Sequence, residues 1–213
     1  MATPAAASKP GRVGRPSINP PDNREEQLLA IARRLFAQQG FNNTALRDIA
    51  EAAKISKAAL YYYFPNKDAL YERVVIESLQ TLLTTVGDAV ARASTPTGRV
   101  QAFMLSSADF LDNERDHWLA AAHAFREAGQ TGRRGVALHL RDTYEKLLRG
   151  CIADGVANGE FRSVDPAMAG RFLLSGLNHV TRWHSPQGKL SVREVVRQFV
   201  DMGLLGLASR GAG

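Results

Sequence analysis

The segment SKAALYYYFPNK, residues 56–67, places three tyrosines and a phenylalanine in succession between lysines. Successive side chains of a helix point about 100° apart, so Tyr61, Tyr62 and Tyr63 cannot all face one core. Some of these hydroxyl groups must meet water or a partner. From residue 52 to residue 67 the chain carries three lysines and no acidic residue. Exposed tyrosines among lysines suit contacts with a phosphate backbone.

Two short helices are predicted to position this segment. Thr44 and Ser56 are predicted to be the N-caps of these helices, and Pro65 ends the second. Their apolar residues recur at helical spacing and would face one core: Leu46, Ile49, Ala50, Ala53, Leu60 and Phe64. Two short helices joined by a three- or four-residue turn form a helix-turn-helix.

The rest of the chain is also predicted to be helical, so the expected fold class is all-α. A first helix starts at Asn23 and ends at Gly40. Further helices are predicted near 67–94, 97–114, 116–128, 133–157, 166–184 and 191–209, separated by proline and glycine. We expect a disordered basic arm over 1–22, a three-helix DNA-binding domain over 23–66, and a larger helical domain over 67–213.

Composition and charge agree with a DNA-binding protein. The net charge of +6 is uneven: residues 1–70 hold ten Lys and Arg against six Asp and Glu (+4), and residues 71–213 hold seventeen against fifteen (+2). No segment free of charged residues is long enough to span a membrane, so no membrane partner is expected. The single cysteine, Cys151, excludes an intrachain disulfide. A cytoplasmic, nucleoid-associated protein is expected.

The segment GFNNTALRDIAEAAKISKAALYYYFPNKDAL, residues 40–70, resembles the DNA-binding signature of the TetR family of bacterial transcriptional regulators. Three positions depart from the usual pattern: Lys54 replaces a turn glycine, and Ala58 and Ala59 replace Gly-Thr. The matching residues are Thr44, Ile49, Ala50, Ala53, Ser56, Lys57, Leu60, Tyr61, Tyr63, Phe64, Lys67 and Leu70.

The resemblance implies that the second short helix lies in the major groove of double-stranded DNA. Arg47 would then reach a guanine edge, and Ala58 and Ala59 would offer only methyl contacts. The residues expected on DNA are Thr44, Arg47, Ser56, Lys57, Ala58, Ala59, Tyr61, Tyr62, Tyr63 and Lys67. In the alternative interpretation, the tyrosines lie at a core edge, with Tyr63 mostly in packing, and the lysines are only solvated.

The amino-terminal segment GRVGRPS, residues 11–17, resembles an element that enters AT-rich minor grooves. In that interpretation Arg12 and Arg15 lie in the narrow groove. A merely solubilising tail explains the segment equally well.

The resemblance also implies a ligand-gated homodimer, in which the helical domain over 67–213 serves effector binding and dimerisation. Its effector pocket is expected among Phe103, Trp118, Phe125, Tyr144, Leu147, Cys151 and Asn178, each of which could equally be ordinary core. The dimer interface is expected at Gly176, Leu177, Val180, Val196, Phe199, Gly203 and Leu204, because glycine within apolar helices suits close helix approach.

No enzyme, cofactor or metal site is expected. The histidine pairs 117/123 and 179/184 are six and five residues apart, so neither pair shares a helix face, and nucleotide-binding glycine motifs are absent from the sequence. The predicted function is a ligand-responsive regulator, a repressor, that binds a palindromic operator as a dimer and is released by a small apolar or amphipathic effector. The alternative is a DNA-associated dimeric scaffold without a ligand response.

Overall fold

The computed structural model describes residues 21–127, 135–185 and 187–207. These residues form nine α-helices and no strand, which confirms the all-α prediction. The helices are α1 (Pro21–Gln39), α2 (Leu46–Ala52), α3 (Lys57–Tyr63), α4 (Lys67–Ala91), α5 (Pro96–Asn113), α6 (Arg115–Glu127), α7 (Gly135–Ala157), α8 (Pro166–Trp183) and α9 (Val192–Leu207).

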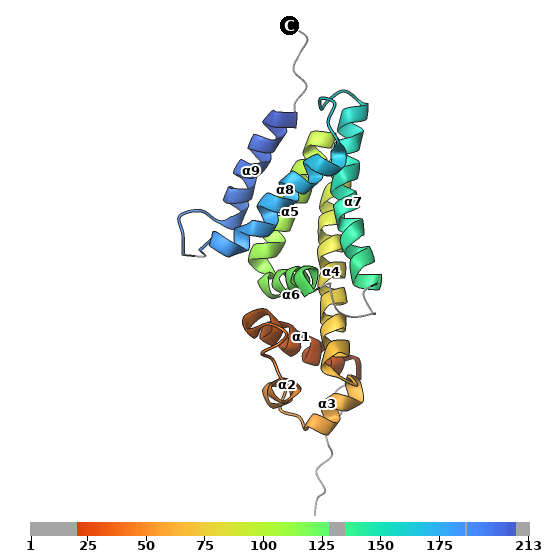
Figure 1. Cartoon of the computed structure of the whole chain (residues 1–213), viewed down its shortest axis with the longest axis vertical. Helices are drawn as coiled ribbons and strands as arrows, with labels where there is room; N and C mark the ends of the chain where they lie inside the picture. Colours follow the sequence, from red (N-terminus) through yellow and green to blue (C-terminus); the bar gives the residue numbers. More distant parts are fainter. Residues whose placement is uncertain (1–20, 128–134, 186, 208–213) are drawn as a thin grey trace, which may run out of the picture.

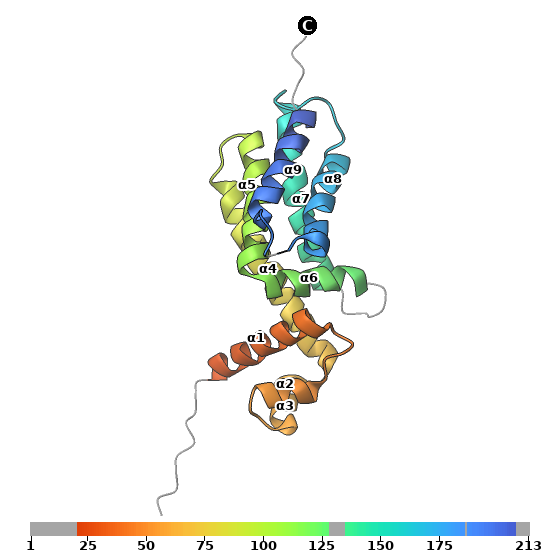
Figure 2. The same ribbon diagram turned by 90° about the vertical axis from the view of Figure 1, so that its left-hand side faces the viewer.

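The helices form two groups along the long axis of the molecule (Figure 1). Helices α1, α2 and α3 lie together at one end. Helix α4 runs from that end into the second group, where α5 packs against α4, α7 and α9, and α8 packs against α7 and α9. Helix α6 crosses between the two groups and contacts both α1 and α4 (Figure 2).

Helix α4 contributes to the core of each group. Its first turns bury Leu70 and Val74 with α1, α2 and α3. Farther along, Leu82, Val86 and Val90 belong to the larger core of the second group. The DNA-binding unit therefore continues into α4, and the predicted boundary at residue 66 falls before residues that complete its core.

Capping residues and prolines set most helix ends. Thr95 and Asp165 accept hydrogen bonds from the first turns of α5 and α8, each of which begins with a proline. Gly40 follows α1 with φ of +80°, in the left-handed region that glycine tolerates. Helix α1 begins at Pro21, two residues before the predicted start.

Helix α4 is the only helix among the described residues that has the length and composition to cross a membrane. Its buried residues all pack within this fold, from Leu70 in the first core to Val90 in the second. A helix that supplies two protein cores needs apolar residues along its length. The packing of α4 therefore accounts for its hydropathy.

Candidate nucleic-acid interface

The helix-turn-helix consists of α2, a turn and α3. Lys54 lies in the turn with φ of +55°, a left-handed conformation that costs a residue with a Cβ about 1 kcal/mol. Ser56 is the N-cap of α3, and its Oγ accepts from the backbone N–H of Ala59 at 3.1 Å. Ile49 and Leu60 are fully buried and hold the two helices on a shared core. The predicted cap at Ser56 is confirmed.

Thr44 does not cap α2, and this prediction was wrong. The N-cap is Ala45, whose backbone N–H donates to the carboxylate of Asp48 at 3.0 Å. The Thr44 side chain is buried, and its hydroxyl donates to the carbonyl oxygen of Gly40 at 2.8 Å. Thr44 therefore fastens the loop to the end of α1 and presents no hydroxyl to DNA.

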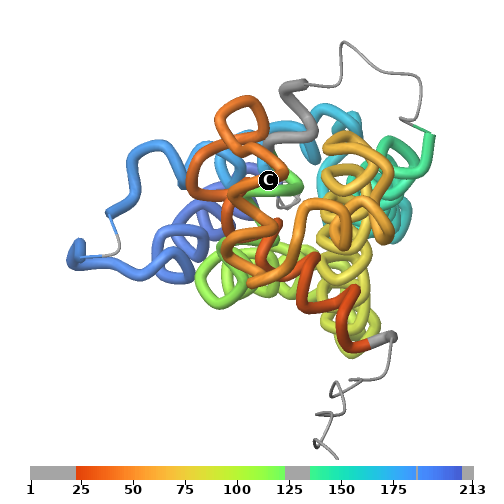
Figure 3. The backbone as a smooth tube through the Cα atoms, turned by 90° about the horizontal axis from the view of Figure 1, so that it is seen from below, coloured from red at the N-terminus to blue at the C-terminus, as the bar shows by residue number. Residues whose placement is uncertain are grey.

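Several predicted DNA-binding side chains of α2 and α3 are exposed. These two helices lie at the end of the molecule from which the backbone is seen in Figure 3. The Arg47 side chain is 76% exposed, and it meets Glu51 on the same helix at 3.5 Å. Tyr62 is 85% exposed and Tyr61 44% exposed, while Lys57 and Ala58 are exposed beside them. Exposed tyrosine hydroxyl groups and cations on one short helix can donate hydrogen bonds to phosphate oxygens.

Two residues of α3 are less available. Tyr63 is half-buried against the core of the DNA-binding unit, and its ring meets Tyr62 edge-on at 5.4 Å between centroids. Ala59 is half-buried. The packing interpretation therefore describes Tyr63 better than a phosphate contact does. On the exposed side, the Lys57 ammonium lies 5.6 Å from the centroid of the Tyr61 ring.

Lys67 has a role inside the fold. Its Nζ donates to the carbonyl oxygen of Thr44 at 2.8 Å and lies 4.2 Å from the centroid of the Phe41 ring. It also reaches the carbonyl oxygen of Asn42 at 3.5 Å. These contacts join the start of α4 to the loop before α2. A cation held in this way still adds positive charge to the surface near α3.

Two further positioning residues were missed from the sequence. Arg24 of α1 donates from Nη2 to the carbonyl oxygen of Ala53 at 3.1 Å, which ties α1 to the end of α2. Asn66 is the N-cap of α4 and accepts from the N–H of Ala69 at 2.8 Å. The Asn66 cap had a sequence signal, an asparagine directly before a helical pattern. The Arg24 contact spans 29 residues and had none.

Most predicted pocket residues lie in the larger core. Phe103, Trp118, Tyr144 and Cys151 are buried there, and Leu147 is partly buried against them. Burial raises the pKa of the Cys151 thiol, which disfavours a reactive thiolate.

Two other pocket residues are not placed in that core. Asn178 is exposed on α8, so it does not join the other predicted pocket residues within this chain. Phe125 belongs to α6, and its side chain lies outside the described residues. Arg12 and Arg15 of the arm also lie outside them.

The predicted dimer residues mostly face the interior of their own chain. Leu177, Val180 and Val196 are fully buried. A Cβ on Gly203 would lie 2.7 Å from the Leu173 side chain, and one on Gly176 would lie 3.1 Å from the ring of Phe199. These glycines therefore allow α8 and α9 to approach within one chain. Phe199 and Leu204 are partly buried in the same core. Leu177, Val180 and Val196 therefore lie on the helix faces that pack inside one chain, and the prediction placed them wrongly on the faces that meet a second chain.

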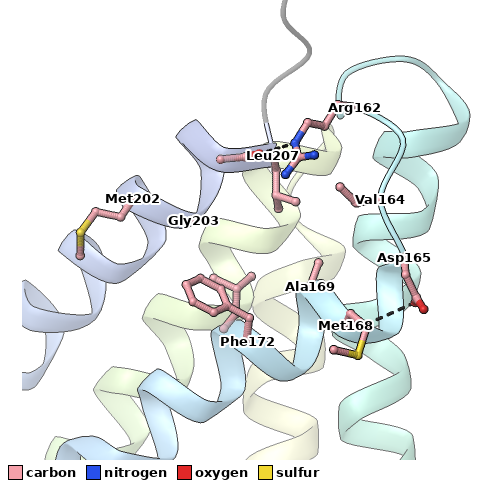
Figure 4. Close-up of a pocket in the computed structure, with 11 residues that line it drawn as sticks. Arg162, Val164, Asp165, Met168, Ala169, Phe172, Met202, Gly203 and Leu207 are labelled. Carbon is pink, nitrogen blue, oxygen red and sulfur yellow. Dashed lines mark hydrogen bonds between the residues drawn. The ribbon is translucent and has the colours of Figure 1, made fainter.

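The outer faces of α8 and α9 carry exposed apolar side chains instead. A groove of about 330 Å³ lies between the two helices, lined in part by Met168, Phe172 and Met202 (Figure 4). Each of these three side chains is at least 60% exposed. Trp183 and Leu205 extend the apolar surface along the same helices and are 57% and 80% exposed. Large apolar patches on a folded chain mark interaction surfaces.

The helix-turn-helix with its basic, tyrosine-rich surface, joined through α4 to a helical domain, defines a DNA-binding regulator. Two family models match the chain: "Bacterial regulatory proteins, tetR family" over residues 28–74, and "Tetracyclin repressor-like, C-terminal domain" over residues 93–207. The second match alone covers more than half of the 213 residues. The chain belongs to the TetR family of bacterial transcriptional regulators.

Known relatives agree with this assignment. The HTH-type transcriptional repressor KstR2 of Rhodococcus jostii is 29% identical over 87% of this chain and 92% of its own length. The structure of the regulator PfmR from Thermus thermophilus is 31% identical, with a TM-score of 0.76 over 84% of this chain and 97% of that one. AibR, solved with isovaleryl coenzyme A and operator DNA, shares the fold at 23% identity, with a TM-score of 0.78 over 84% and 97% of the two chains.

The family and these relatives establish the general function. The chain is a DNA-binding transcriptional regulator with a repressor role, and it is not an enzyme. Regulators of this family bind small-molecule effectors as well as DNA.

Proposed function

We propose that this repressor binds a palindromic operator as a homodimer and is released from it by a small apolar or amphipathic effector. The observation that carries the proposal is the exposed surface of α2 and α3, where Arg47, Lys57 and Tyr62 extend from one end of a rigid unit. A single short helix reads only a few base pairs, so a dimer that contacts two half-sites gains both affinity and specificity.

The apolar outer face of α8 and α9 supports the dimer. Phe172 and Met202 border the groove between these helices and are exposed in one chain. In a two-fold dimer the same patch of both copies forms the interface, so each apolar side chain of the patch is buried once in each copy. A partner helix pair from a second copy would remove Phe172, Met202 and Leu205 from water. This surface lies away from α2 and α3, which leaves both DNA-binding units free (Figure 1).

An effector that contains a coenzyme A thioester fits the proposal best. AibR was solved with isovaleryl coenzyme A and operator DNA, and it shares this fold. The larger core of this chain contains aromatic and aliphatic residues, among them Phe103 and Trp118. An acyl chain could be accommodated among such residues, and its polar headgroup would stay near the surface.

Titration of the full chain on its own promoter fragment tests this function. We expect binding with a dissociation constant at least about 10³-fold lower than that for an unrelated fragment of equal length. A panel of apolar and amphipathic metabolites, including acyl coenzyme A thioesters, should contain compounds that release the promoter. Specific binding that no compound releases would favour the scaffold alternative, and equal affinity for both fragments would contradict the proposed repressor.

A further inference from the structure

Helix α6 packs into both cores of the molecule. Trp118 in its first turn is buried in the larger core of the effector domain. Ala120, two residues later, is fully buried in the core of the DNA-binding unit. Figure 2 shows α6 between the two groups of helices. A shift of α6 would therefore disturb the packing of both domains.

The indole N–H of Trp118 is buried and has no hydrogen-bond partner among the described residues. Nδ1 of His117, the residue before it, is also buried without a partner. The buried hydroxyl groups nearby do have partners. The Ser107 hydroxyl donates to the carbonyl oxygen of Phe103 at 2.7 Å, so the Tyr144 hydroxyl, 2.7 Å from Ser107 Oγ, must donate to it. The hydroxyl of Ser78 donates to the carbonyl oxygen of Val74 at 2.7 Å. Within the described part of the chain, the indole N–H of Trp118 is thus a donor left without an acceptor.

A buried donor without an acceptor destabilises a fold, and its presence calls for an explanation. The indole nitrogen can only donate, so its missing partner must be an acceptor atom. The surrounding core is apolar, which favours a ligand with a single acceptor on an apolar body. The carbonyl oxygen of an acyl thioester has these properties.

We propose that Trp118 is the polar contact of the effector and donates to the carbonyl oxygen of an acyl thioester, and that α6 transmits this binding to α1. The inference rests on the proposed ligand-released repressor and names the effector class and the residue that recognises it. Trp118 would distinguish a thioester from an apolar compound of the same shape that lacks the carbonyl.

The contacts of His117, the residue before Trp118, provide the connection to α1. Its Nε2 accepts a hydrogen bond from Nη1 of Arg33 on α1. The other terminal nitrogen of Arg33 lies 3.1 Å from the carboxylate of Glu77 on α4. Arg33 is mostly buried, so this hydrogen bond lies in a medium that strengthens it. Movement of Trp118 toward a ligand would shift His117 and loosen α1, which carries the helix-turn-helix.

Paired ligands test the Trp118 contact. Isovaleryl and octanoyl coenzyme A are compared with their thioether analogues, in which a methylene group replaces the carbonyl. For the unmodified chain, calorimetry without DNA should show the thioesters binding roughly 10-fold more tightly than the thioethers. Trp118→Phe should remove this preference, because phenylalanine keeps the apolar contact and lacks the donor. Trp183→Phe, at an exposed tryptophan of α8, is the matched control and should keep it.

A second variant tests the transmission. Arg33→Met keeps an unbranched side chain but cannot donate to His117. It should bind isovaleryl coenzyme A within about threefold of the unmodified chain, as expected for a residue that does not touch the ligand. The ligand should nevertheless release it from promoter DNA less completely. Thermal melts show whether each variant is folded, and the comparison of thioester with thioether remains valid for any folded variant.

The outcomes separate this inference from the proposed function. If the thioesters do not bind, or if Trp118→Phe keeps the 10-fold preference, the assignment of Trp118 is wrong, even where another compound releases the promoter. If Arg33→Met is released as completely as the unmodified chain, the route through His117 is wrong. If the unmodified chain does not bind its promoter specifically, the proposed function itself fails, whatever the thioester data show.

Discussion

At the scale of single residues, the helix-turn-helix separates side chains that hold the fold from side chains that face solvent. The Thr44 hydroxyl and the Lys67 ammonium are engaged by backbone carbonyl oxygens. Arg47 and Tyr62 are exposed and have few contacts within the chain. Base contacts determine which sequence is bound, and phosphate contacts mainly determine affinity and register. Arg47, which can pair with a guanine edge, is therefore the residue on which sequence preference should depend most.

Arg47→Ala is expected to weaken operator binding by about 1–3 kcal/mol and to relax preference at one base pair of each half-site. Binding to unrelated DNA should change much less. Glu51→Ala is the matched control, because it removes the exposed partner of Arg47 and keeps the guanidinium. Fluorescence anisotropy with operator variants measures both effects. An unchanged order of preference among operator variants in Arg47→Ala would remove Arg47 from base recognition.

His117 should make folding stability depend on pH. Burial, with a contribution from Arg33, lowers the pKa of His117 from 6.5 to about 4. Between these two values the unfolded chain binds a proton that the folded chain excludes, so stability falls as pH falls. We expect a loss of about 2 kcal/mol between pH 7 and pH 5 from this residue.

Chemical unfolding of the unmodified chain and of His117→Gln at both pH values measures this contribution. Glutamine can accept the hydrogen bond from Arg33 and does not titrate, so the variant should lack this part of the pH dependence. Titrations common to the two proteins cancel in the comparison. Equal pH dependence in both would mean that His117 is not held neutral by the fold.

Some site residues could be predicted from the sequence because their function is local. Ser56 was recognised as an N-cap from the residues that follow it, and the structure has this cap. Thr44 and Lys67 were placed on DNA because they match a family motif. In the structure the Thr44 hydroxyl donates to the carbonyl oxygen of Gly40, and the Lys67 ammonium donates to the carbonyl oxygen of Thr44. A motif shows that a residue type is needed at a position. The partner of its side chain depends on how distant segments pack.

At the scale of helices, the sequence predicted the positions of the helices well. It predicted less well which face of each helix packs against the chain's own core. Prolines and capping residues mark the starts of α5 and α8, so these boundaries were close. Helices α8 and α9 are apolar on two faces, with Leu177 turned inward and Phe172 turned outward. Periodicity alone does not tell which apolar face meets the chain's own core. The predicted dimer residues consequently included several that are buried within one chain.

Phe172→Glu should weaken the proposed dimer by about 2 kcal/mol or more, since a two-fold interface carries each change twice and desolvates each charge. The chain should stay folded, because Phe172 is 69% exposed in one copy. Thr84→Glu, at an exposed position of α4, is the matched control. Sedimentation velocity over a range of concentrations measures the association. A Phe172→Glu variant that associates as tightly as the control would exclude this face as the interface.

At the scale of the whole molecule, α4 and α6 connect the two domains. Helix α4 contributes Val74 to one core and Val86 to the other, and α6 contributes Ala120 and Trp118 in the same way. A ligand can alter DNA affinity only if it binds one arrangement of the dimer better than the other. Helices shared between cores offer a physical means for this coupling, because neither domain can shift independently of them.

Binding to operator DNA should depend steeply on salt. A dimer that makes six or more phosphate contacts is expected to lose about 10³-fold or more in affinity between 50 and 200 mM salt. Lys57→Ala should reduce the slope, because it removes an exposed cation from each copy. Anisotropy titrations at several salt concentrations measure the slope. A nearly flat dependence would contradict the proposed phosphate contacts of α3.

Footprinting of the full chain on its own promoter region tests the central claim most directly. A dimer that places one α3 in each of two half-sites should protect two related segments whose centres lie about 34–36 Å apart, or a multiple of one helical turn. Addition of the effector should remove both protected segments together. Protection of one isolated segment, or none above the background on unrelated DNA, would contradict the account of a dimeric, ligand-released repressor.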